Sequence, residues 1–212
     1  MTRVLLHPLP VRIWHWVNAF GFVTMIVTGL QIRYVGLMDI LSFRAAVSVH
    51  NAMGFVLIAN FFIWLIFYLS SDRIRVYHPD LNPAHFFRGS FRQIRFYSYG
   101  IFAGEPNPHH VDPYSKFNPL QIMTYQLVMF ILVPLQFVTG VMLWDVKRFP
   151  AAVEALGGLR VVDTIHVLIF IFFVGYVIVH AYLGTLGHTP TEHFKAMFSG
   201  YEDVDEKRPG DR

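Results

Sequence analysis

The stretch HVLIFIFFVGYVIVH, residues 166–180, decides the fold of this chain. Its interior is apolar and aromatic without a charged residue, and a histidine closes each end. An ionisable side chain in a membrane-spanning helix is costly and marks a functional site by default. The interpretation therefore depends on whether the segment crosses a membrane and on what the other histidines do.

The composition indicates an integral membrane protein. Of the 212 residues, 54% are hydrophobic and only 15% are charged, whereas a soluble domain carries about 25% charged residues. The mean hydropathy is +0.44. The chain has no cysteine, which excludes disulfides, thiolate-bound iron–sulfur clusters and cysteine-ligated zinc within it. We expect the chain to lie in a lipid bilayer and to bind no nucleic acid.

Four apolar segments are each longer than the roughly 20 residues that cross about 30 Å of hydrocarbon. They cover residues 11–32, 43–70, 118–144 and 159–186. Pro134 lies inside the third and is expected to kink that helix without ending it. The first segment is too long for a signal peptide. The sequence thus predicts an all-α integral membrane four-helix bundle, with residues 1–212 forming a single domain.

Two further helices are predicted outside the spans. In the loop 71–117, arginines share one helical face and apolar residues lie beside them: Arg88, Arg92 and Arg95 with Phe87, Phe91 and Ile94. This pattern indicates a cytoplasmic interfacial helix at lipid phosphates, or a docking surface for a cytoplasmic protein. In the tail 187–212, residues 189–192 form a capping-box sequence that opens a short helix, and Gly200 is placed to end it. We expect the charged end from Glu202 onward to be frayed.

Lysine and arginine predict the orientation, because cytoplasmic loops carry an excess of them. Five lie on the side of the loops that follow the first and third spans: Arg33, Arg44, Lys147, Arg148 and Arg160. The other twelve lie on the side that carries both termini. Both termini are therefore predicted to be cytoplasmic, and the loops near 33–43 and 145–158 should face the periplasm or its equivalent.

Four histidines in the spans form two pairs by depth. His15 and His180 lie near the cytoplasmic ends of the first and fourth spans, and His50 and His166 lie near the outer ends of the second and fourth. The fourteen positions from His166 to His180 cover about 21 Å of helix and bring the side chain back to within about 40° of its first direction. Both can therefore face the bundle interior. Any one histidine could instead hydrogen-bond a neighbouring carbonyl.

Bis-histidine haem suits such pairs, with one haem in each leaflet. Axial imidazoles from facing helices leave no open position on the iron, which favours electron transfer over small-molecule binding. A zinc or hard-cation site fits less well, because no carboxylate lies inside a span. Several glycines could make room for porphyrin faces or mediate ordinary helix packing: Gly21, Gly29, Gly54, Gly140 and Gly175.

Four motifs make the sequence recognisable: PVRIWHW at 10–16, SVHNAMGFVL at 48–57, FNPLQIMTYQ at 117–126 and IHVLIFIFFVGYVIVHAYL at 165–183. They resemble the di-haem cytochrome b subunits of membrane-bound nickel–iron hydrogenases, formate dehydrogenases and thiosulfate reductases, within the cytochrome b-561-type superfamily. The resemblance implies two haem b groups in the cytoplasmic (inner) membrane of a bacterium or archaeon. Their axial iron ligands would be His15, His50, His166 and His180. One departure counts against the hydrogenase branch, since residues 162–165 lack the extra histidine usual there.

The resemblance also implies a quinone site near the cytoplasmic haem, with menaquinone or ubiquinone as exchangeable substrate. The matching residues lie around the start of the third span: Tyr114, Asn118, Gln121 and Tyr125. Asn118 and Gln121 are one helical turn apart and could face one pocket. Asn118 before Pro119 equally fits a helix cap.

Arginines at the span ends could bind the haem propionates. Arg12 at the cytoplasmic end, and Arg33 or Arg44 at the outer end, could each grip a carboxylate bidentately. Basic residues at helix ends also anchor to lipid headgroups.

The sequence therefore predicts the membrane anchor and electron-transfer subunit of a respiratory oxidoreductase. It would pass electrons between the quinone pool and a periplasmic redox partner, either an iron–sulfur or a multihaem protein. Quinone chemistry would belong to this chain, and other substrate chemistry to the partner. Two rival functions remain open: a stand-alone di-haem enzyme that exchanges electrons between quinone and superoxide, and a haem-free transporter or proton channel.

Overall fold

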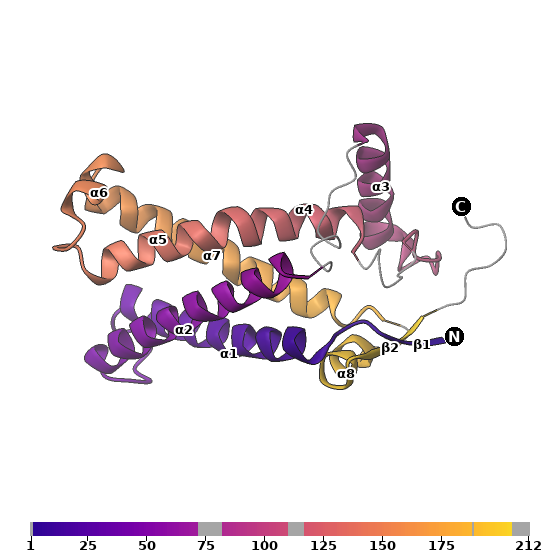
Figure 1. The fold of residues 1–212 in the computed structure, drawn as a ribbon, viewed down its shortest axis with the longest axis horizontal. Helices are drawn as coiled ribbons and strands as arrows, with labels where there is room; N and C mark the ends of the chain where they lie inside the picture. Colours follow the sequence, from indigo (N-terminus) through magenta and orange to yellow (C-terminus); the bar gives the residue numbers. More distant parts are fainter. Residues whose placement is uncertain (1, 72–81, 110–116, 188, 205–212) are drawn as a thin grey trace.

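In the computed structural model, which describes residues 2–71, 82–109, 117–187 and 189–204, the four predicted spans are helical. They are α1 (Leu9–Arg33), α2 (Phe43–Leu69), a composite third span, and α7 (Leu159–Leu183). All four run along the long axis of the molecule (Figure 1), and each is long and apolar enough to cross a membrane. The prediction of an all-α bundle with four membrane spans is confirmed.

The third span changes its hydrogen-bond pattern just before a proline. It consists of α4 (Pro119–Leu127), the π-helical stretch η3 (Val128–Leu132) and α5 (Val133–Trp144). Pro134 lacks a backbone N–H, and its ring crowds the carbonyl four residues earlier. A π-helical turn accommodates such a break inside a continuing helix. The span therefore continues past Pro134, as the sequence predicts.

Short polar residues and glycine set the helix starts. Ser42 accepts a hydrogen bond from the Ala45 N–H before α2, and Asn118 accepts one from the Gln121 N–H before α4. These side chains satisfy N–H groups that the first helical turn leaves without a partner. Gly158, immediately before α7, has a φ of +94°, a conformation that favours glycine.

The first and last strands of the described residues pair at one end of the bundle. Strand β1 (Thr2–Leu5) pairs antiparallel with β2 (Tyr201–Val204), and the N–H groups of Leu6 and His7 both donate to the Gly200 carbonyl at 3.0 Å. Helix α8 (Glu192–Ser199) precedes β2 and ends at Gly200, whose φ is +88°. The predicted tail helix and its glycine stop are confirmed. The expectation that the chain frays from Glu202 is wrong for residues 202–204, because β1 supplies their backbone partners.

Helix α3 (Pro83–Arg95) lies across the long axis in Figure 1 and continues into the π-helical η2 (Phe96–Gly100). Its apolar residues Phe87, Phe91 and Ile94 are exposed. An apolar stripe on a helix that crosses the direction of the spans is the arrangement of an interfacial helix. At the other end of the bundle, α6 (Pro150–Ala155) joins α5 to α7.

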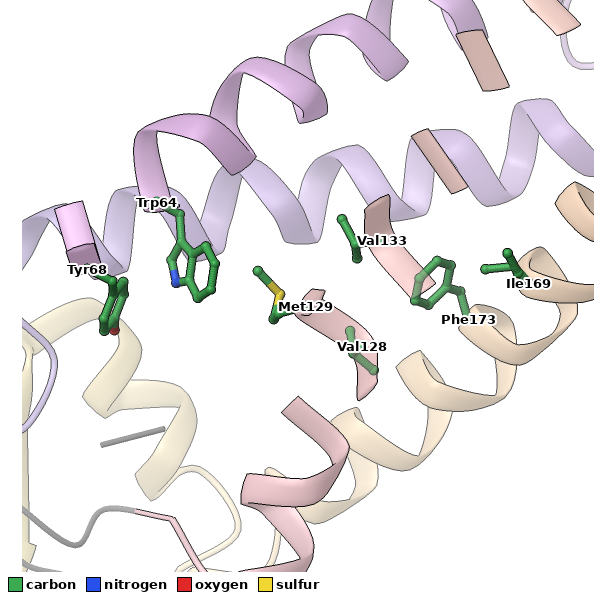
Figure 2. Close-up of a cluster of buried hydrophobic side chains, with 7 residues drawn as sticks. All are labelled: Trp64, Tyr68, Val128, Met129, Val133, Ile169 and Phe173. Atoms are coloured by element: carbon green, nitrogen blue, oxygen red, sulfur yellow. The ribbon is translucent and has the colours of Figure 1, made fainter. Parts of the chain in front are cut away.

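The core lies between α2, the third span and α7. Figure 2 shows Trp64 and Tyr68 of α2 near Met129 of η3, with Phe173 of α7 on the far side of the cluster. Trp64 is 2% exposed and stacks on Trp14 of α1 at 5.8 Å between ring centroids. The outward faces of the spans expose apolar side chains, as expected of surfaces in contact with lipid.

Candidate functional site

The bundle brings the four predicted histidines together as two pairs. The inner pair, His15 near the start of α1 and His180 near the end of α7, lies toward the end of the bundle that carries the β1–β2 pair, and its ring centroids are 6.1 Å apart. The outer pair, His50 of α2 and His166 of α7, lies at the opposite end, with centroids 6.5 Å apart. Both pairs match the pairing by depth that the sequence predicts.

The spacing of each pair suits one metal ion between two imidazoles. A metal–nitrogen bond of about 2 Å to each ring, with each nitrogen about 1 Å from its centroid, sets the centroids roughly 6 Å apart. Neutral imidazoles from two facing helices are the donor set of a bis-histidine haem. Among the described residues, no group of three or more His, Asp or Glu residues could hold a metal ion. The residues therefore fit haem better than a protein-only metal site.

Glycines beside the outer pair support the same fit. A Cβ at Gly29 would lie 3.4 Å from Cε1 of His50, and a Cβ at Gly140 would lie 3.2 Å from Cε1 of His166. Glycine at both positions keeps a Cβ away from the Cε1 edge of the facing histidine ring. Gly21 differs, because a Cβ there would lie 2.5 Å from Leu57, so this glycine serves the close packing of α1 against α2.

Hydroxyl groups contact the outer histidines. Oγ1 of Thr28 lies 2.9 Å from Nδ1 of His50, and Oγ1 of Thr139 lies 3.0 Å from Nδ1 of His166. The amide nitrogen of Gln136 lies 3.2 Å from Nε2 of His166. The sequence reasoning missed these three residues, because a hydroxyl or amide on a span carries no period or charge that distinguishes it from packing.

Aromatic rings surround the inner histidines. Tyr176 stacks on His180, one helical turn away, at 5.7 Å and 20° between planes, and Trp16 meets His15 edge-on at 5.3 Å. The indole N–H of Trp16 also donates to the Met197 carbonyl at 3.1 Å, which ties α1 to α8. Trp16 therefore contributes to the packing at this end of the bundle.

Two of the candidate quinone residues at the start of α4, Asn118 and Gln121, hydrogen-bond each other. The Gln121 N–H donates to Asn118 Oδ1 at 2.9 Å, and the Asn118 N–H donates to Gln121 Oε1 at 3.0 Å. The Asn118 side-chain amide also donates to the Tyr97 hydroxyl at 3.1 Å. Burial raises the pKa of Tyr97, and the side-chain hydrogen bonds with Gln93 and Asn118 oppose that rise. The helix-cap reading of Asn118 is confirmed. The capping box leaves the amide N–H groups of Gln121 as donors, and Tyr114 lies outside the described residues.

The candidate propionate residues occupy different surroundings. The Arg12 guanidinium donates to the Phe198 carbonyl at the end of α8. Arg33 forms a half-exposed ion pair with Asp163 of α7, with 3.3 Å between Nη1 and Oδ2. Arg44 is exposed at the start of α2. Arg12 and Arg33 thus already contact acceptors of this chain, and a propionate would have to share or replace them.

Comparison with known proteins agrees with this arrangement. The family described as prokaryotic cytochrome b561 matches residues 6–200, which include all four histidines. The Escherichia coli (strain K12) protein named “Putative cytochrome YdhU” is 35% identical over 203 residues, covering 94% of this chain and 74% of that protein. Haem b is the cofactor that the family implies. The chain belongs to the prokaryotic cytochrome b561 family of membrane-bound b-type cytochromes, which take part in electron transport.

Proposed function

We propose that this chain is the membrane anchor and electron-transfer subunit of a respiratory oxidoreductase. It would hold two b haems, one at each histidine pair, and pass electrons between a periplasmic redox subunit at the outer end and the quinone pool at the inner end. Both termini would lie in the cytoplasm, and the partner would supply the remaining substrate chemistry.

The observation that carries this proposal is the placement of two histidine pairs at two depths along one helix. His166 and His180 both belong to α7, and each lies opposite a histidine of a different helix. Their separation of fourteen residues corresponds to about 21 Å of helix, a large share of the roughly 30 Å hydrocarbon thickness. A single site would need only one pair, whereas transfer across the membrane needs carriers near both faces.

His15 with His180, and His50 with His166, would each hold a haem, which would supply a one-electron carrier. The other residues of this chain would orient and enclose it. Ile169 and Phe173, which lie between His166 and His180 along α7, belong to the buried apolar cluster. An apolar interior excludes water and strengthens the electrostatic effect of neighbouring groups.

A quinone site at the inner end has support from the packing of α4. Tyr125 of α4 and Tyr176 of α7 both pack against the buried core cluster, and Tyr176 stacks on the inner His180. The side-chain amide N–H groups of Gln121, one turn before Tyr125, have no acceptor among the described residues. They are donors of the kind that a quinone carbonyl accepts. We assign Gln121 and Tyr125 as the residues to test first for quinone binding, with Asn118 as their structural support.

Elements outside the four spans favour a subunit of a complex over a stand-alone enzyme. Helix α3 with its exposed Phe87 and Phe91, helix α8, and the β1–β2 pair all lie at the inner end (Figure 1). A minimal electron carrier needs none of them. Their presence supports a protein that is held at the membrane surface in a fixed orientation.

The test is a reduced-minus-oxidised visible spectrum of the purified protein, combined with a pyridine haemochrome assay. We expect b-type absorption and two haems per chain, and co-purification of a redox subunit when the protein is isolated gently from its native membrane. A folded, colourless protein would contradict the proposal and would move the same histidines to a transport or proton-channel function. Two haems without any associated subunit would favour the stand-alone quinone oxidoreductase.

A further inference from the structure

The tripeptide Val-Thr-Gly occurs twice, at 27–29 in α1 and at 138–140 in α5. Each copy lies beside a histidine of the next long helix in the chain. Thr28 contacts His50 of α2, and Thr139 contacts His166 of α7. Both threonines are buried, with exposures of 2% and 0%. The two outer histidines therefore have matching threonine and glycine neighbours, supplied by separate parts of the chain.

The direction of these hydrogen bonds follows from the single proton of a hydroxyl. Thr28 Oγ1 lies 2.7 Å from the carbonyl of Thr24, and Thr139 Oγ1 lies 2.8 Å from the carbonyl of Leu135. A carbonyl only accepts, so each threonine donates its proton to its own helix. The hydroxyl oxygen is then left to accept the proton on histidine Nδ1.

This assignment fixes the tautomer of both rings. With the proton on Nδ1, Nε2 carries the lone pair that a metal needs. Without a metal, the amide nitrogen of Gln136, 3.2 Å from Nε2 of His166, would donate to that lone pair, and it would give way where Nε2 binds iron. The glycine that follows each threonine keeps a side chain away from Cε1, the ring atom between the two nitrogens.

We propose that Thr28 and Thr139 are positioning residues for the outer haem. Each would accept the Nδ1–H of the facing histidine, present Nε2 to the iron and raise the basicity of the ligand. The inference rests on the proposed function, because it needs haem at the outer pair. A more basic ligand favours the oxidised iron, so removing either hydroxyl should favour the reduced form of the outer haem.

The variants Thr28→Val and Thr139→Val keep the side-chain shape and remove the acceptor, and Thr28→Ser and Thr139→Ser keep the hydroxyl. In a redox titration of the two-haem protein, each valine variant should shift the equilibrium of the outer haem toward reduction by threefold to tenfold, the range for about one hydrogen bond. Tenfold is 59 mV for a one-electron couple. The inner haem should not shift, and the serine variants should restore the wild-type value.

A second measurement does not depend on the variants. In fully reduced protein labelled with ¹⁵N-histidine, the Nδ1–H protons of His50 and His166 should give resonances protected from solvent exchange, and each should be lost in its valine variant. Fast-exchanging Nδ1–H protons in the wild type would overturn the proposal, even if the valine variants do not accumulate. The proposal would also be overturned if the valine variants left the reduction potential of the outer haem unchanged, or shifted the potentials of both haems equally.

Failure of this inference can be distinguished from failure of the proposed function. A purified protein that holds no haem contradicts the proposed function. If the protein binds two haems but the reduction potential of the outer haem is unchanged in Thr28→Val and Thr139→Val, only the proposed role of the threonines is contradicted.

Discussion

His166 and His180 belong to one unbroken helix, α7, yet each faces a histidine from a different helix. His166 faces His50 of α2 at 6.5 Å, and His180 faces His15 of α1 at 6.1 Å between ring centroids. One helix therefore supplies half of each candidate haem site. The fourth span fixes the distance between the sites, while the first two spans complete them.

This arrangement predicts which double substitutions are additive. Replacing His15 and His180 together by alanine should lower the haem content from two to one, the same loss as either single change, because both residues serve one site. Replacing His15 and His166 together should remove both haems. The measurement is the pyridine haemochrome assay per chain, with protein quantified independently. Loss of both haems in the same-pair double variant would contradict the pairing.

Membrane orientation can be tested cleanly because the chain has no cysteine. Ala84 in α3 and Ala155 at the end of α6 are both exposed and lie at opposite ends of the bundle. In intact cells, a membrane-impermeant maleimide should label Ala155→Cys and should label Ala84→Cys only after the cells are opened. The reverse pattern would place the inner pair at the periplasmic side and contradict the orientation predicted from lysine and arginine.

Two glycines make a matched pair for helix packing. A Cβ at Gly21 would lie 2.5 Å from Leu57, whereas a Cβ at Gly175 would meet nothing within 4 Å. Gly21→Ala should destabilise the bundle by about 1–3 kcal/mol through overpacking, while Gly175→Ala should be neutral or stabilise it by up to about 1 kcal/mol through helix propensity. Thermal unfolding in detergent checks both, and equal effects would contradict the close approach of α1 and α2.

Substitutions of Asn118 and Gln121 should have different effects, although the two residues share one capping box. Asn118→Ala removes a helix cap and should lower stability by about 0.5–2 kcal/mol, with a smaller change in quinone turnover. Gln121→Leu removes the free amide donor and should slow quinone reduction with both haems retained. Haem content, thermal stability and quinol-dependent haem reduction give the comparison. An unaltered quinone reaction in Gln121→Leu would argue against a site at the start of α4.

The spans and the histidines could be predicted from the sequence because both carry strong periodic or compositional signals. The boundaries of α1, α2 and α7 agree with the predicted segments to within a few residues, since apolar runs of this length have few alternatives in a bilayer. His15, His50, His166 and His180 stood out as polar exceptions within those runs.

The residues that sequence reasoning missed act through tertiary contacts. Thr28 and Thr139 are ordinary residues in a membrane helix until a histidine of another helix lies beside them. The β1–β2 pair joins residues about two hundred positions apart, and neither four-residue strand has a pattern that reveals its partner. In both cases the missing information is which helices or strands lie next to each other in the fold, and local sequence does not contain it.

The β1–β2 pair contains a cluster of titratable groups that should make its stability depend on pH. Glu202 of β2 lies 2.8 Å from Nδ1 of His193 and 3.8 Å from Nε2 of His7. Burial tends to raise the pKa of Glu202, but the hydrogen bonds from His193 and His7 outweigh it and lower the pKa from 4.5 to about 2. The hydrogen bond to Glu202 raises the pKa of His193 above 6.5, against its partial burial.

The pKa shifts of Glu202 and His193 set the limits of the pH range in which the β1–β2 pair is most stable. A lowered carboxyl pKa stabilises the folded state above about pH 4.5, and this contribution is lost as the pH falls toward 2. A raised histidine pKa stabilises it below about pH 6.5, and this contribution is lost as the pH rises through the raised value. Hydrogen exchange of the β2 backbone amides, corrected for intrinsic rates, should therefore be slowest between these limits.

Glu202→Gln is the control for this pH dependence. The amide is nearly the same size as the carboxylate but cannot ionise, so the variant should exchange faster and lose both limbs of the profile. His7→Gln should have a smaller effect than His193→Gln, because His7 is farther from the carboxylate. A Glu202→Gln variant with the wild-type profile would show that other groups govern the pairing of β1 with β2.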